Sequence, residues 1–83
     1  MAYNITYKKS VEKDLAGIST TEAKRILDKI ERDLRMKPET YPMLKGRFSG
    51  LRKFRVGDYR VVFTITGADI LILRIGNRKD VYR

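Results

Sequence analysis

The chain has neither cysteine nor histidine among its 83 residues. The absence of cysteine excludes disulfides and thiolate metal sites, and with them the cross-links that stabilise many small secreted domains. Without histidine as well, the common zinc-binding spacings are absent. We therefore expect one domain spanning residues 1–83, with no bound metal or cofactor and with a single apolar core that supplies its stability.

Long apolar runs are missing too. The longest, Ile70 to Leu73, is far shorter than the roughly 20 residues that a membrane-spanning helix needs. No apolar segment of the kind found in a secretory signal follows Met1. The sequence predicts a soluble, cytoplasmic protein that does not contact a membrane.

Negative charge is scarce in the second half of the chain. Residues 1–44 hold 9 basic and 7 acidic side chains, net +2, whereas residues 45–83 hold 10 basic and 3 acidic ones, net +7, which together give the +9 of the whole chain. A concentrated positive field of this kind attracts a polyanion, most often a nucleic acid. A solubilising charge or an acidic protein partner is the alternative explanation.

The first half of the sequence predicts one strand and two helices. Residues 3–7 alternate in polarity and predict a short strand, and Ser10 is placed to cap a short helix that ends near Gly17. Ser19 begins a capping-box pattern for a longer helix of about four turns, which ends before Pro38. The apolar stripe of this longer helix consists of Ala23, Ile26, Leu27, Ile30 and Leu34.

The second half predicts a loop followed by three strands. Pro and Gly residues mark the loop at 38–50, and alternating segments predict strands at 52–56, 59–66 and 70–75. Gly57-Asp58 has the pattern of a two-residue hairpin turn. The fold class is therefore α+β, with an N-terminal strand and a two-helix hairpin packed on a mainly antiparallel sheet that ends in a three-strand meander.

Alternation also assigns side chains to the two faces of that sheet. Strict alternation in the last strand groups Leu71, Leu73 and Ile75 on one face, and Ile70 and Ile72 with Arg74 on the other. The face opposite the core then gathers a set of cationic and aromatic side chains: Lys53, Arg55, Arg60 and Arg74, with Arg78 and Tyr82 from the tail. Each alone is ordinary surface decoration, but an uncompensated cluster of guanidinium groups favours a phosphate-binding face.

Three stretches of the chain resemble the RelE/ParE superfamily of toxins. These are residues 44–46, residues 51–63, which contain GDYRVVF, and residues 75–83, which contain NRKDVY. The order of elements is also similar, so the resemblance covers nearly the whole chain. It implies a RelE-like fold and an mRNA endonuclease that acts on the ribosome, needs no metal and is held inactive by an acidic, partly disordered antitoxin similar to RelB.

The resemblance also implies the site residues. The catalytic set on this chain is Lys53, Arg55, Arg60, Arg78 and Tyr82. Contacts to RNA and ribosome are expected from Lys45, Arg47, Arg52, Arg74, Lys79 and Arg83. In the chemistry of such toxins the ribose 2′-hydroxyl attacks its own 3′-phosphate, which requires a proton acceptor and stabilisation of the developing charge.

Two departures from the pattern affect the roles of these residues. Arg55 stands where some members carry a second lysine, and Asn77 where many carry histidine. Arginine is a poor base, so Lys53 becomes the candidate base, and Arg78 the candidate for stabilising the transition state. Two other functions are compatible with the same scaffold: a ParE-like inhibitor of gyrase, and a non-catalytic nucleic-acid-binding module.

Overall fold

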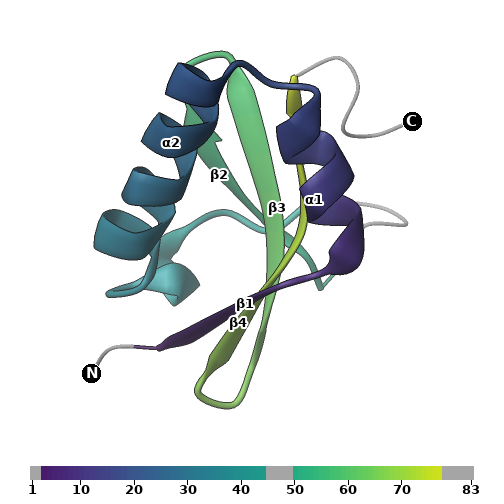
Figure 1. Cartoon of the computed structure of the whole chain (residues 1–83). Coiled ribbons are helices and arrows are strands. Elements are labelled where there is room, and N and C mark those ends of the chain that lie inside the picture. The colour runs from purple at the N-terminus through teal and green to yellow at the C-terminus, as the bar shows by residue number, and fades with distance from the viewer. Residues whose placement is uncertain (1–2, 45–49, 78–83) are drawn as a thin grey trace.

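The computed structural model of the protein describes residues 3–44 and 50–77. One strand, two helices and then three further strands follow one another along the chain, and Figure 1 shows how they are arranged. In chain order the elements are β1 (Asn4–Tyr7), α1 (Lys9–Ala16), α2 (Thr20–Lys29), a π-helical continuation (Ile30–Leu34), a short 3-10 turn (Pro38–Thr40), β2 (Arg52–Val56), β3 (Tyr59–Thr66) and β4 (Asp69–Asn77). The α+β fold expected from the sequence is confirmed.

The four strands form one sheet in the order β1-β4-β3-β2. β2, β3 and β4 form the antiparallel meander, and β1 lies parallel to β4 at the other edge, with Asn4 opposite Asp69. A parallel neighbour needs a crossover connection, and here the connection from β1 to β4 contains both helices, β2 and β3. β2 is therefore the second edge of the sheet.

Both helices lie against the same side of the sheet, as Figure 1 shows. Their apolar stripes supply four fully buried residues to the core: Val11, Ile26, Ile30 and Leu34. The strands supply the rest: Phe54, Val56, Val61, Phe63, Ile70, Ile72 and Ile75. The opposite side of the sheet, called here the reverse face, carries Lys53 and Arg55 of β2 and Arg60 of β3. Among the described residues, no helix has the length and apolar character needed to span a bilayer.

The two helix starts differ from each other. At α2 the Ser19 hydroxyl accepts a hydrogen bond from the Glu22 N–H at 3.3 Å, as the capping pattern predicts. The expectation that Ser10 caps α1 is wrong, because Lys8 occupies the N-cap position and α1 begins at Lys9, so Ser10 lies inside the helix. The Ser10 hydroxyl instead donates to the Leu73 carbonyl at 3.1 Å and attaches α1 to β4.

β4 does not alternate strictly, and this corrects the expected assignment of its faces. β3 has 8 residues where β4 has 9, and the register shifts between Val62, opposite Arg74, and Phe63, opposite Ile72. Leu73 is thus the extra residue of a β-bulge, which inverts the alternation on either side of it. Ile72 is consequently in the core, as Ile70 is, whereas Arg74 does lie on the reverse face. The strand also continues through Gly76, where the sequence predicted its end, to Asn77.

Candidate functional site

The reverse face carries two rows of side chains across the meander. Arg55 of β2 lies directly opposite Arg60 of β3 in the first row. In the second row Val62 of β3 lies between Lys53 of β2 and Arg74 of β4. The structure therefore brings together the four sheet residues that the sequence predicts for the basic face.

The Arg55–Arg60 pair places two positive charges on directly facing positions of the β2–β3 hairpin. The hairpin closes with Val56 opposite Tyr59, so the next pair belongs to the non-hydrogen-bonded type, whose side chains stand closest. Like charges directly opposite each other destabilise a sheet. The Arg55 Nε–H donates to the Gly57 carbonyl at 3.2 Å, which holds this guanidinium near the turn. An anion bound between the two arginines would relieve their repulsion.

Val62 is only 4% exposed although it belongs to the reverse face and not to the core cluster. Its cross-strand neighbours, Lys53 and Arg74, have long aliphatic stems that can cover an apolar side chain while the charged ends stay in solvent. The second row therefore combines an apolar centre with cationic ends.

Arg74 has an acidic partner, so the expectation of an uncompensated cluster does not hold for this residue. Its Nε and a terminal nitrogen donate to the two carboxylate oxygens of Asp14, at 3.1 and 3.4 Å. The same carboxylate accepts the Ile75 N–H at 2.9 Å. Asp14 thus joins α1 to the edge of β4 beyond the end of β1, and it neutralises one side of the basic face.

A concavity of about 300 Å³ opens at the outer edge of β2, and its lining combines apolar and cationic side chains. The lining residues are Tyr41, Pro42, Lys53, Phe54, Arg55 and Arg60. The loop before β2 pairs with this edge over a short stretch only: the Pro42 carbonyl accepts the Lys53 N–H, and the Leu51 carbonyl accepts the Leu44 N–H. The concavity begins where that pairing stops, next to Arg55.

Tyr41 and Pro42 are site residues that sequence reasoning missed. They lie in the loop that Pro and Gly residues predict, and nothing local indicates that this loop returns to β2. The residue that connects this loop to β2 is Arg52, for which the sequence predicts a contact to RNA. One terminal nitrogen of its guanidinium donates to the Tyr41 and Glu39 carbonyls at 2.7 and 3.1 Å. Arg52 therefore anchors the loop that walls the concavity.

Six of the predicted site residues lie outside the described part of the chain: Lys45, Arg47, Arg78, Lys79, Tyr82 and Arg83. The last described residue, Asn77, belongs to β4, the strand next to the Arg60 strand. Their predicted roles stay predictions.

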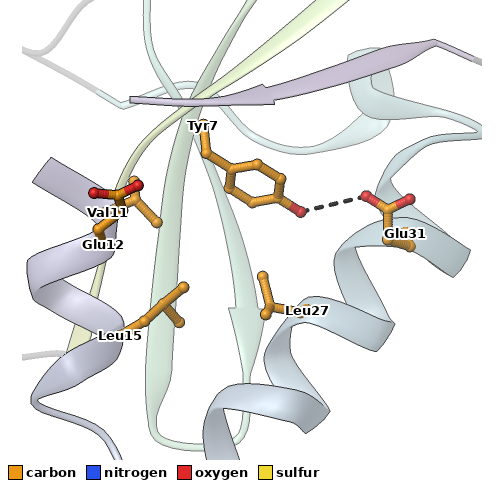
Figure 2. A pocket seen from close by; sticks show the side chains of 6 residues that line it. All are labelled: Tyr7, Val11, Glu12, Leu15, Leu27 and Glu31. Carbon is orange, nitrogen blue, oxygen red and sulfur yellow. Dashed lines mark hydrogen bonds between the residues drawn. The ribbon is translucent and has the colours of Figure 1, made fainter. Parts of the chain in front are cut away.

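A second concavity, of about 430 Å³, lies between α1 and α2 and differs in character from the first (Figure 2). Its lining is mainly apolar, with two carboxylates: Tyr7, Val11, Glu12, Leu15, Leu27 and Glu31. The Tyr7 hydroxyl donates to Glu31 at 3.3 Å across it. Burial, and then the Glu31 charge, raise the pKa of Tyr7 to about 12. Carboxylates repel phosphate, so this groove does not suit a nucleic acid.

Comparison with known proteins identifies the family. The family model for the ParE toxin of type II toxin-antitoxin systems, parDE, matches residues 5–82. The chain belongs to this toxin family. It is thus a type II toxin of the wider RelE/ParE superfamily, as the motifs indicated. No curated protein sequence matches the chain.

Solved structures of the superfamily share the fold of this toxin. A chain of the RelBE2 toxin–antitoxin complex from Mycobacterium tuberculosis aligns with a TM-score of 0.87 at 21% identity, covering 94% of this chain and 100% of that one. The archaeal RelE–RelB complex from Pyrococcus horikoshii gives 0.68 at 27% identity, with 98% and 100% covered. The chromosomal ParDE system of P. aeruginosa gives 0.72 at 17% identity, with 92% and 96% covered. Both branches of the superfamily are therefore represented among the structural neighbours.

Proposed function

We propose that this toxin is a metal-independent endoribonuclease of the RelE type, which cuts mRNA on the ribosome and thereby arrests translation in the cytoplasm. The observation that supports it is the arrangement of Lys53, Arg55 and Arg60 around one concavity, with two arginines directly opposed. Bidentate guanidinium groups that remain charged are suited to a phosphate whose negative charge grows during reaction.

The proposed reaction needs only the chain's own side chains. The ribose 2′-oxygen bonds to the adjacent phosphorus while the bond from phosphorus to the 5′-oxygen of the next nucleotide breaks. Lys53 takes the 2′-hydroxyl proton, and Arg55 and Arg60 stabilise the charge on the phosphate oxygens. Arg78 stabilises the departing 5′-oxygen, which takes up a proton from water, and Tyr82 stacks on or orients the substrate.

We further propose that a cognate antitoxin controls the toxin. Two of the structural neighbours are toxins solved in complex with antitoxins, the RelBE2 and RelE–RelB complexes. A segment with net charge +7 would otherwise bind cellular RNA indiscriminately, and an acidic, partly disordered RelB-like chain can cover such a wide surface. Co-expression of the toxin with a small acidic protein from a neighbouring gene should restore growth.

The nuclease is tested by inducing the toxin alone in growing bacteria and mapping the 5′ ends of ribosome-bound messages by primer extension. New ends within codons, absent when the Arg60→Ala variant is induced, are the expected result. Purified ribosomes programmed with a short message provide the same test without other cellular nucleases. Intact messages during complete growth arrest would contradict the proposal.

Inhibition of gyrase is the second candidate, because the matching family model is that of ParE toxins. A supercoiling assay with purified gyrase separates the two functions. Loss of supercoiling at toxin concentrations that leave ribosome-bound mRNA intact would assign the chain to the gyrase inhibitors. If the toxin bound RNA but had neither activity, the non-catalytic binding module would be supported.

A further inference from the structure

The concavity at the edge of β2 is more than a cluster of cations. Three of its lining residues are apolar or aromatic (Tyr41, Pro42 and Phe54) and three are cationic (Lys53, Arg55 and Arg60). A phosphate alone needs only the cations. The apolar wall therefore calls for a ligand with a flat, weakly polar part as well as an anionic one.

The aromatic wall is held in place from behind. The Tyr41 ring packs edge-on against Phe54 and Phe63, with centroids 5.0 and 6.4 Å apart. Its main-chain carbonyl is fixed by the Arg52 guanidinium at 2.7 Å. Ring and backbone are thus anchored independently, and a preorganised ring loses little freedom when a ligand packs on it.

The backbone of β2 adds polar groups on the same side. In this strand alternate residues direct their N–H and carbonyl away from β3, and the bonds of Leu51 and Lys53 to the preceding loop show that odd-numbered residues do so. Arg55 is the next such residue, and its main-chain N–H and carbonyl consequently face the concavity. One donor and one acceptor at an edge match the hydrogen-bonding edge of a nucleobase.

We propose that this concavity is a nucleotide subsite, in which one base of single-stranded RNA packs against Tyr41 and Pro42 while its phosphate lies between Arg55 and Arg60. The inference rests on the proposed function for the choice of RNA, and it extends that function by locating the base beside the reacting phosphate. Aromatic stacking combined with a cationic groove is the general mode of single-strand recognition. The acidic groove between the helices lacks the cations for it.

The test compares the binding of adenosine 3′-monophosphate, uridine 3′-monophosphate and inorganic phosphate to the purified toxin, without ribosomes, by calorimetry. Stacking of one base predicts that both nucleotides bind roughly 5- to 100-fold more tightly than phosphate. Tyr41→Leu should abolish that difference and leave phosphate affinity unchanged, whereas Tyr41→Phe should retain it. Tyr7→Leu, the same change in the concavity between the helices, is the matched control and should change neither the nucleotide affinity nor the phosphate affinity.

Tyr41→Leu also removes packing on Phe54, so a second measurement on the unaltered protein keeps the inference testable. Nucleotide should shift the NMR signals of the Tyr41 ring and the Arg55 amide, and phosphate should shift only the latter. Equal affinities for nucleotide and phosphate, or shifts at Leu15 and Leu27 instead, would overturn the subsite. A toxin that binds nucleotides here but leaves messages intact would refute the nuclease and not the subsite.

Discussion

Arg55 and Arg60 stand opposite each other on neighbouring strands, an arrangement that works against folding. We expect Arg60→Ala to lower the single-turnover cleavage rate by roughly 10²–10³, because a preorganised charge at a developing anion is lost.

Arg32→Ala is the control for the loss of cleavage in Arg60→Ala. Arg32 is 68% exposed on the π-helical segment, outside both concavities, so its removal changes net charge equally without touching the basic face. Cleavage should be unaffected in this variant. If both variants lost activity to the same degree, general charge and not position would be responsible.

Tyr7 makes the stability of the fold depend on pH in the alkaline range. Its folded-state pKa, raised by burial to about 12, lies above the ordinary value of 10, so the folded protein holds this proton more tightly than the unfolded chain. The resulting stability is complete below about pH 10 and is lost as pH rises through 12. Tyr7→Phe should therefore lose less stability between pH 9 and 11.5, which urea midpoints at a series of pH values measure.

The pKa values of Tyr3 and Tyr41 are also raised, by a hydrogen bond to Glu39 and by burial respectively. Some alkaline loss should for that reason persist in Tyr7→Phe, and the difference from wild type is the relevant quantity. Identical pH profiles for the two proteins would show that Tyr7 ionises equally in the folded and unfolded states.

At the scale of elements, Asp14 connects α1 to β4 through hydrogen bonds. Its side chain is 13% exposed and accepts hydrogen bonds from the Ile75 N–H and the Arg74 guanidinium. Asp14→Ala should lower the free energy of unfolding by roughly 1–3 kcal/mol, because a buried donor and a charge lose their partner. Asp14→Asn keeps an acceptor for Ile75 and should cost less; denaturant midpoints give both values.

Asp28→Ala serves as the comparison, since Asp28 is exposed on α2. Its effect should stay within about 0.5 kcal/mol. A loss at Asp14 no larger than at Asp28 would mean that α1 stays attached to the sheet through its apolar contacts alone.

Sequence patterns predicted the elements well where each is governed by local chemistry. The bounds of β2 and β3 match the prediction, because alternation and the Gly57-Asp58 turn define them. Glycine is required in this turn, since Gly57 has a φ of +59° and an added Cβ would collide with the Arg25 guanidinium. The order β1-β4-β3-β2 is settled by long-range pairing, and no local pattern contains it.

β4 shows why the rest of the fold and of the candidate site could not be predicted from the sequence. One unpaired residue, Leu73, moves Ile72 from the expected reverse face into the core. Nothing in the composition of the strand marks the bulge, since every residue around it is apolar or long. For the same reason the partner of Arg74 was missed: Asp14 is 60 residues away in the sequence.

For the whole molecule, the uneven charge predicts strongly salt-dependent binding to RNA. A single strand contributes a slope of about −0.7 in log affinity against log salt for each phosphate contacted. Arg55→Ala and Arg60→Ala should each reduce the slope by about that amount, whereas Arg32→Ala should not. Fluorescence anisotropy of a labelled oligonucleotide over a range of KCl concentrations measures the slope, and a slope unchanged by Arg55→Ala would exclude this residue from phosphate contact.

The parallel pairing of β1 with β4 also has a consequence for the order of events during protein synthesis. Asn4 pairs with Asp69, and Asp14 needs Arg74, so the sheet cannot be completed until the ribosome has added about 65 further residues. At about 5–20 residues per second this takes roughly 3–13 s. Throughout that interval β1 has no strand beside it and the basic face is incomplete. The assembled toxin therefore exists only after its synthesis is nearly complete, and a partner that recognises the nascent chain has those seconds in which to bind first.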